Sequence, residues 1–250
     1  MKSNLFFLFL ITLLLTTHLS QAQWIAPFAI IKDKDGFTYV RSEEKAGSKI
    51  IDTLRLNQVF EDLNLPPVNE TSKSDWHMVT YGKYGVRKNG VIKMTHEAQG
   101  YIHKSRIQYL KDLPQLKKKI QHDSIKLYND SIQVIIVTGK FITQEHKMTY
   151  EGNYVRKIDG EEPWGIDGML YPKTTEIKSI KILLKNKEYS FPKNSIHLML
   201  EPNSEEIRVA LSDNNTMFLS MSNSDAAGAY NVVWTIQNGM VNSQFINRDF

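Results

Sequence analysis

The sequence predicts a mainly β fold with one or two short helices. Short runs of β-branched and aromatic residues alternate along the chain with clusters of Gly, Asp, Asn and Lys, which is typical of strands joined by turns. The pairs Asn89-Gly90 and Asn238-Gly239 stand between such runs, and Asn-Gly is the strongest short signal for a β-hairpin. Few segments show helical periodicity, so we expect strands to dominate both halves of the chain.

The first residues are typical of an export signal. Met1-Lys2 supplies a positive start, residues 5–15 are apolar, and Ser20-Gln21-Ala22 places small residues where signal peptidase reads them. The apolar run is shorter than the roughly 20 residues that cross a membrane. We therefore expect cleavage after residue 22, leaving no transmembrane segment, and an exported protein that is either periplasmic or secreted.

The chain contains no cysteine. A bacterial lipoprotein needs a cysteine directly after its cleavage site, so the exported protein is not expected to carry a lipid anchor. Disulfides, thiolate zinc sites and cysteine nucleophiles are excluded for the same reason. The fold must then be stabilised by its core alone.

Length and charge indicate two domains without a nucleic-acid site. A chain of 250 residues fits two domains of ordinary size, predicted at 24–110 and 131–250 with a linker at 111–130. The excess of 31 Lys and Arg over 27 Asp and Glu is small, and Lys117-Lys118-Lys119 is its one dense run. We interpret that run as a solvated helix face, since nucleic-acid binding needs a larger patch with residues that read bases.

Four strands are predicted at the start of the first domain, at residues 28–31, 37–41, 50–54 and 59–63. The phrase Asp33-Lys-Asp-Gly36 between the first two resembles a calcium loop, but Gly36 comes too early and the distal Glu is missing. A tight turn is the better interpretation, with Gly36 in a conformation of positive φ.

Four phrases in this domain resemble those of bacterial SH3-like (SH3b) domains. They are Tyr39-Val-Arg41, the strand Asp75-Trp-His-Met-Val79, the strand Gly100-Tyr-Ile-His103, and the single helical turn Lys104-Ser-Arg-Ile107. The resemblance implies a small β-barrel that holds a ligand in a groove and performs no chemistry. The chain departs from the family at residues 42–48 and in an enlarged excursion at residues 80–98, which we expect to add a pair of strands.

Candidate ligand-binding residues are the aromatic and polar side chains that strand alternation leaves outside this barrel. Aromatic faces stack on sugar rings or peptide side chains, and arginine can pair with a carboxylate in bidentate fashion. The alternative is that Trp76 and Tyr101 belong to the core and that the others are ordinary surface residues. The predicted set is Tyr39, Arg41, Trp76, Tyr101 and His103, with His77 as a further outward-facing residue.

The second half is predicted as a linker followed by an antiparallel β domain, folded as a sandwich or half-barrel. Leu116, Ile120, Ile125 and Leu127 indicate either a short amphipathic helix or a structured linker. Residues 132–137 form an apolar run expected of a strand buried on both faces. Proline suits a first helical turn, so residues 192–200 are the second helix candidate. Hairpins are predicted at 176–191, 207–221 and 230–246.

Two phrases of the second half carry polar residues that the strand pattern does not explain. Residues 159–168 concentrate Asp159, Glu161, Glu162 and Asp167 around an aromatic residue. This is mostly the composition of a solvated loop, and otherwise that of a carboxylate pair in a glycosidase or of a calcium site. Residues 222–230 precede Asn231-Val-Val-Trp234, and this end of the chain resembles that of uncharacterised exported bacterial proteins, which implies no activity.

The sequence lacks the motifs of catalysis and metal binding. The histidines have neither His-x-His nor His-Glu-x-x-His spacing, and no Gly-x-Ser-x-Gly elbow is present. We therefore predict no catalytic residue, no metal and no cofactor. The leading hypothesis is a non-catalytic protein of the cell envelope that binds wall peptide, glycan or a protein partner. The alternatives are an inhibitor or immunity protein against an envelope-acting toxin and an unrecognised cell-wall hydrolase.

Overall fold

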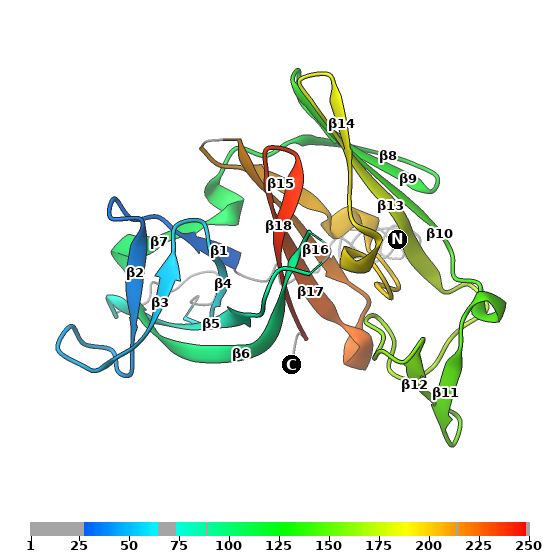
Figure 1. The fold of residues 1–250 in the computed structure, drawn as a ribbon, viewed down its shortest axis with the longest axis horizontal. Helices are drawn as coiled ribbons and strands as arrows, with labels where there is room; N and C mark the ends of the chain where they lie inside the picture. The colour runs from blue at the N-terminus through cyan, green and yellow to red at the C-terminus, as the bar shows by residue number, and fades with distance from the viewer. Residues whose placement is uncertain (1–27, 65–73, 89, 214, 249–250) are drawn as a thin grey trace, which may run out of the picture.

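The structure is a computed structural model that describes residues 28–64, 74–88, 90–213 and 215–248 (Figure 1). The predicted export signal lies outside these residues. The protein is mainly β, as the sequence predicts, and its helical parts are single 3-10 turns. No helix in the described ranges is long and apolar enough to span a membrane.

The first half forms a small curled sheet that matches the predicted strands closely. Gly36 has a φ of +80° and makes the tight turn expected between the first two strands. The elements are β1 (Phe28–Ile31), β2 (Phe37–Arg41), β3 (Ile50–Arg55), β4 (Val59–Asp62), β5 (Trp76–Tyr84), β6 (Ile92–His103), the turn η2 (Lys104–Arg106), β7 (Ile107–Tyr109) and the turn η3 (Leu110–Asp112).

The excursion at residues 80–98 does not add a separate pair of strands. It lengthens β5 and β6, which stay paired from Trp76 opposite His103 to Tyr84 opposite Met94. The two strands form one long hairpin, with a single register shift between Lys83 and Tyr84. The outer end of this hairpin reaches the second half of the chain.

The second half contains two sheets and a projecting hairpin (Figure 1). The three predicted hairpins are all present. The elements are β8 (Lys117–Gln121), β9 (Ser124–Tyr128), β10 (Ile132–Lys140), η4 (Thr143–Glu145), β11 (Met148–Glu151), β12 (Tyr154–Ile158), β13 (Thr175–Leu184), β14 (Lys187–Ser190), η5 (Lys193–Ser195), η6 (Ser204–Glu206), β15 (Arg208–Leu211), β16 (Thr216–Asn223), η7 (Ala226–Gly228), β17 (Tyr230–Gln237) and β18 (Met240–Arg248).

The helix alternative for the first of the two candidate segments in this half is wrong, and the second helix is shorter than predicted. The segment around Leu116 to Leu127 forms the hairpin β8–β9, so Lys117-Lys118-Lys119 lies on a strand and not on a helix. The spacing of its apolar residues fits the alternation of a strand as well as the periodicity of a helix. Pairing of β9 with β10 stabilises the strand. Residues 192–200 contain the single 3-10 turn η5 and no longer helix.

Strand β10 is central in its sheet but is not buried on both faces. The order β14-β13-β10-β9-β8 places it between two neighbours. Val134 and Ile136 are buried, whereas Val137 is 37% exposed. One face of the apolar run therefore looks toward solvent, which corrects the prediction for residues 132–137.

Strands of the sheet β15–β18 are enclosed on both faces, and β17 is an example. Residues on one of its faces, such as Val232 and Trp234, pack with the five-stranded sheet. Val233, on the other face, packs with Phe28, Ile30 and Phe245. The sheet β15–β18 is thus the middle layer of the molecule, with the five-stranded sheet on one side and the small curled sheet on the other.

The two predicted domains share a sheet and a core. Within the described residues they form one eleven-stranded sheet, in the order β15-β16-β17-β18-β6-β5-β4-β1-β7. Strand β2 also pairs with β6, and β3 pairs with β2. The connection is a short parallel pairing, in which Ser243 and Gln244 of β18 lie opposite Ile92 and Lys93 of β6. Asn247 Nδ2 also donates to Glu61 Oε2 at 2.6 Å across this junction.

Replacement of Phe245 by alanine tests how strongly the halves depend on each other. Phe245 is 1% exposed and makes an edge-to-face contact with Phe28, so its loss opens a cavity between the halves. We expect Phe245→Ala to lower the free energy of unfolding by about 3 to 5 kcal/mol in urea titration. Met240→Ala on the same strand, where the side chain is 63% exposed, is the control and should change it by less than about 0.5 kcal/mol. Equal effects of the two variants would contradict the shared core.

Candidate functional site

Four of the five predicted ligand-binding residues line one open cavity of about 340 Å³ on the curled sheet. We call this cavity the β2 groove. Its predicted residues are Tyr39, Arg41, Trp76 and His103, and the structure adds Thr38, Ser105 and Arg106. The volume lies at the lower end of the range of small-ligand sites. The groove joins β2, the start of β5, the end of β6 and the turn η2.

Strand alternation places the groove side chains on the outer face. Thr38 and Val40 of β2 are buried, whereas Tyr39 is 45% exposed and Arg41 is half-buried. Trp76 of β5 lies directly opposite His103 of β6, and their rings meet edge to face with centroids 5.3 Å apart. The cross-strand pair therefore fixes two aromatic faces beside the cationic residues.

Gly100 allows β2 to reach this position. A Cβ atom at Gly100 would lie 2.4 Å from Val40 Cγ1 and 3.0 Å from the backbone oxygen of Arg41. The β2 strand can therefore cross β6 there only because Gly100 has no side chain. The glycine of the Gly100-Tyr101 phrase thus has a packing role, which is to bring Arg41 beside Tyr101 in the register of the two strands.

The lining of the groove is cationic. Arg41 uses one nitrogen, Nη1, to donate to the Ser48 oxygen at 2.7 Å, and its guanidinium carbon lies 5.9 Å from the centroid of the Trp76 ring. Arg106 Nη1 pairs with Asp33 Oδ2 at 2.8 Å. Among the described residues that line the groove there is no carboxylate. Arg41 makes no ion pair with any described residue, so it remains available to an anionic group.

His103 is held in a defined orientation. The backbone nitrogen of Ser105 donates to His103 Nδ1 at 3.3 Å, and the Ser105 hydroxyl lies 2.8 Å from the same atom. In the neutral ring the proton is therefore on Nε2, because Nδ1 accepts. That Nε2–H makes no hydrogen bond within the ranges that the structure describes and can serve as a donor.

The remaining candidates have different surroundings. Tyr101 is half-buried on the same strand face as His103 but is not part of the groove lining. His77 points inward, where its Nδ1 lies 2.7 Å from Asp62 Oδ2, and the Tyr109 hydroxyl donates to the same oxygen at 2.6 Å. The sequence suggested an outward His77, and this is wrong because residues at odd and even positions of β5 alternate between the two faces. Burial and this hydrogen bond raise the pKa of Tyr109.

The loop at residues 42–48 is ordered by its own polar contacts. The Ser48 hydroxyl contacts the Glu43 oxygen at 3.0 Å and the Lys45 oxygen at 2.9 Å. The excursion at residues 80–98 contributes no residue to the described groove lining. The enlarged excursion therefore takes no part in forming the β2 groove.

No protein-family model matches the chain, and it has no significant match among curated proteins or solved structures. The SH3b resemblance stays a prediction.

The two unexplained phrases of the second half meet in space. The Ser224 hydroxyl donates to the Gly165 oxygen at 2.9 Å, and a Cβ atom at Gly228 would lie 3.1 Å from that oxygen. The Trp164 backbone nitrogen donates to the Leu198 oxygen, and the Leu200 nitrogen donates to the Trp164 oxygen, each at 3.0 Å. We call residues 159–168 the acidic loop. It is fixed against the end of the C-terminal sheet, and a cavity of about 410 Å³ opens beside it.

The four carboxylates of the acidic loop have separate roles. Asp159 accepts from His146 Nδ1 at 2.6 Å and from the Lys147 backbone nitrogen at 2.8 Å. The His146 hydrogen bond is the main cause that lowers the pKa of Asp159. Glu162 and Asp167 line the cavity, and Glu161 does not. Within the described part of the chain, no three His, Cys, Asp or Glu side chains are placed to hold a metal ion.

The sequence pattern did not predict three of the arginines that line the cavities. They are Arg106 in the β2 groove, and Arg156 and Arg248 in the second cavity. Arg106 belongs to the helical turn that follows the Gly100-Tyr101 strand. Its position shortly after His103 in the sequence could have placed it near the other predicted residues. Arg156 and Arg248 lie on strands nearly a hundred residues apart, and nothing local links them.

Substitution of Gly100 tests the close crossing of β2 and β6. We expect Gly100→Ala to cost about 1 to 3 kcal/mol of stability, because the added methyl group overlaps Val40 and the Arg41 backbone. Gly47→Ala is the matched control, since a Cβ atom there meets nothing within 4 Å. Thermal or urea unfolding measures both variants. A Gly100→Ala protein as stable as the Gly47→Ala protein would show that the crossing is not close.

The pH dependence of stability tests the Asp159 contact. The folded-state pKa of Asp159 is lowered, so its contribution is fully present above the unfolded value of about 3.9 and is lost as the pH falls through the lower folded value. We expect Asp159→Asn to be less stable than the wild type at neutral pH, and the difference to shrink below about pH 4. Denaturant midpoints measured across this range provide the comparison. A pH-independent difference for Asp159→Asn would contradict the assignment.

Proposed function

We propose that the protein is a non-catalytic binding protein of the cell envelope, exported after removal of residues 1–22, and that the β2 groove holds its ligand. The observation that carries the proposal is the convergence of Tyr39, Arg41, Trp76 and His103 on one cavity. These residues come from three strands that are distant in sequence. Pairing of β2 and β5 with β6 brings these side chains together, and their combination of two aromatic rings with two nitrogen donors supports a binding role.

The chemistry of the groove favours a ligand with a carboxylate beside a flat or apolar body. Arg41 offers its remaining guanidinium nitrogens, and His103 offers its Nε2–H. Charge-assisted hydrogen bonds of this kind are stronger than neutral ones. Tyr39 and Trp76 offer ring faces and edges to a sugar ring or a peptide side chain. Cell-wall peptide attached to glycan carries all of these groups, and we propose it as the ligand class.

A protein partner is the second candidate, in the form of an inhibitor of an envelope-acting toxin. The observation that favours it is the β11–β12 hairpin, which projects from the rest of the molecule (Figure 1). Tyr150 and Tyr154 on this hairpin are exposed. Exposed tyrosines on a projecting element are typical of protein-binding surfaces.

Binding to purified peptidoglycan tests the leading proposal. We expect the protein without residues 1–22 to be retained at low salt, and Arg41→Gln to bind about tenfold more weakly, because a charged hydrogen bond contributes about 1.5 to 3 kcal/mol. Sedimentation with the insoluble wall, followed by quantification of the unbound protein, measures the affinity.

Arg55→Gln controls for the general attraction of a basic protein to an anionic polymer. Arg55 is exposed on the neighbouring strand β3, outside the groove. Its loss should change retention little. No retention of the wild type would refute wall binding and leave the protein partner as the better proposal. Equal losses for Arg41→Gln and Arg55→Gln would refute the role of the groove.

A further inference from the structure

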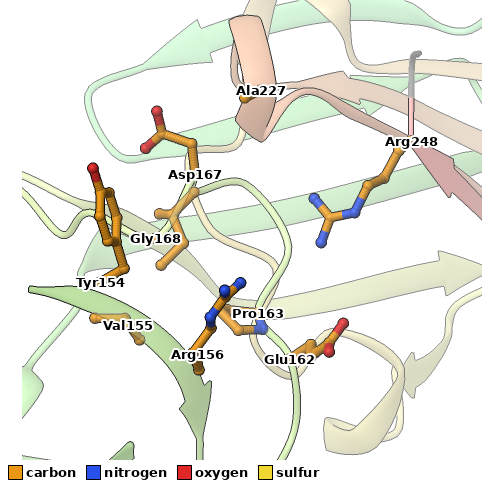
Figure 2. A pocket seen from close by; sticks show the side chains of 10 residues that line it. Tyr154, Val155, Arg156, Glu162, Pro163, Asp167, Gly168, Ala227 and Arg248 are labelled. Atoms are coloured by element: carbon orange, nitrogen blue, oxygen red, sulfur yellow. The ribbon is translucent and has the colours of Figure 1, made fainter. Parts of the chain in front are cut away.

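A second cavity, distant from the β2 groove in sequence, lies beside the acidic loop and measures about 410 Å³ (Figure 2). We call it the Arg248 cavity. Its walls come from β12, the acidic loop, the turn η7 and the last residue of β18. The lining residues are Tyr154, Val155, Arg156, Glu162, Pro163, Ile166, Asp167, Gly168, Ala227 and Arg248.

The walls of this cavity are held in place by backbone contacts. The Val155 nitrogen donates to the Gly168 oxygen at 2.7 Å, which ties the acidic loop to β12. Gly168 has a φ of +88°, and a Cβ atom there would lie 3.0 Å from the Tyr154 ring. The middle of the loop is tied to Leu198 and Leu200 through Trp164. The cavity is therefore formed before any ligand arrives, which lowers the entropic cost of binding.

The same region contains unusual backbone conformations. Ala226, next to the cavity wall, has a φ of +44°, and Ser224 has a φ of +60°. Leu198, whose oxygen accepts from Trp164, has a φ of +56°. Residues other than Gly, Asn and Asp rarely adopt this region, and such strain gathers at ligand sites when the surrounding contacts enforce it.

Two arginines converge on the cavity from different strands. Figure 2 shows the guanidinium groups of Arg156 and Arg248 directed into the space between them. Arg156 pairs through Nε with Glu151, which leaves its terminal nitrogens free of described ion pairs. Arg248 lies with its guanidinium carbon 4.9 Å from the centroid of the Trp164 ring and makes no ion pair with any described residue. Stacking on Trp164 thus orients this cation without neutralising it.

Carboxylates and apolar surface complete the lining. Asp167 and Tyr154 lie on the side of the cavity opposite Arg248 (Figure 2). Glu162 lies below Arg248 in this view. Neither Asp167 nor Glu162 is in an ion pair with a described residue. Pro163 and Ile166 add apolar surface. Unlike the β2 groove, this cavity therefore presents separated positive and negative groups.

We propose that the Arg248 cavity binds a small zwitterion of the amino-acid or short-peptide class. The ligand carboxylate pairs with Arg248 and Arg156, its ammonium group pairs with Asp167, and its body contacts the Tyr154 ring. A purely anionic ligand would face the repulsion of Asp167 and Glu162, and a purely cationic one that of the two arginines. Only a ligand with both charges at opposite ends satisfies the lining.

Blocked peptides test this proposal on the wild-type protein. Isothermal titration calorimetry would compare free trialanine with its N-acetylated form and its C-terminal amide. We expect free trialanine to bind, and each blocked form to bind about tenfold more weakly, because each loses one charged hydrogen-bonding partner. Absence of binding by free trialanine, or equal binding of all three peptides, would overturn the proposal.

Substitutions assign each end of the ligand to its partner. In Arg248→Gln we expect free trialanine and its amide to bind alike, and in Asp167→Asn free trialanine and its acetylated form to bind alike. If Arg248→Gln keeps the preference for the free acid, or if Asp167→Asn keeps the preference for the free amine, the assignment is wrong. Circular dichroism and melting temperature confirm that each variant is folded.

Two controls separate this site from general charge effects and from the β2 groove. Lys157→Gln removes an exposed cation next to Arg156 that is not part of the lining, and it should leave the affinity for trialanine unchanged. Arg41→Gln tests whether the carboxylate of trialanine enters the β2 groove instead of the Arg248 cavity. A tenfold loss in either control would show that trialanine binds elsewhere. Loss of wall binding in Arg41→Gln with intact trialanine binding keeps the two proposals distinguishable.

Discussion

Strand β6 makes two kinds of pairing, and the arrangement of the whole chain depends on them. Its first residues lie parallel to β18, and the rest of the strand lies antiparallel to β5, with β2 crossing near its end. The turn between β5 and β6 is therefore fixed to the last strand of the chain. This places one face of β1 and β4 against β15–β18, where Phe28 and Phe245 meet. Because β1 alternates between this core and the interior of the curled sheet, neither core is complete without it.

This arrangement connects two proposed binding surfaces of different character. The β2 groove is formed at one end of β6, where the absence of a side chain at Gly100 lets β2 approach. The Arg248 cavity is formed at the end of β18, where a loop is fixed by Trp164 and Ser224. Both use side chains at strand ends and in loops, and both depend on sheets whose interiors are apolar. The two linings differ in how charges are distributed, which is cationic in the groove and mixed in the cavity.

Much of the strand pattern was predictable because hairpins are encoded locally. Asn238-Gly239 adopts the positive φ values that a tight hairpin turn requires, and the flanking strands follow. Four of the five predicted groove residues also meet, because alternation within β2, β5 and β6 sets which side chains face outward. The local sequence pattern did not reveal which strand would be covered by another sheet on both faces. The run at 132–137 is as apolar as β17, but only β17 has a sheet on each side. Likewise, the approach of Arg156 to Arg248 depends on tertiary packing that no local pattern records.

The lysine run on β8 has a further consequence for the behaviour of the protein at high concentration. Strand β8 is the last strand of the five-stranded sheet, so one row of its backbone groups has no neighbouring strand in the described fold. Such an edge can recruit a strand from another molecule and begin aggregation. Lys117 and Lys119 are exposed on this edge strand, whereas Lys118 donates to the Ser204 and Glu205 backbone oxygens, and a second copy of the strand would bring the exposed like charges together. The basic segment thus acts as a solubility safeguard for the open side of the sheet.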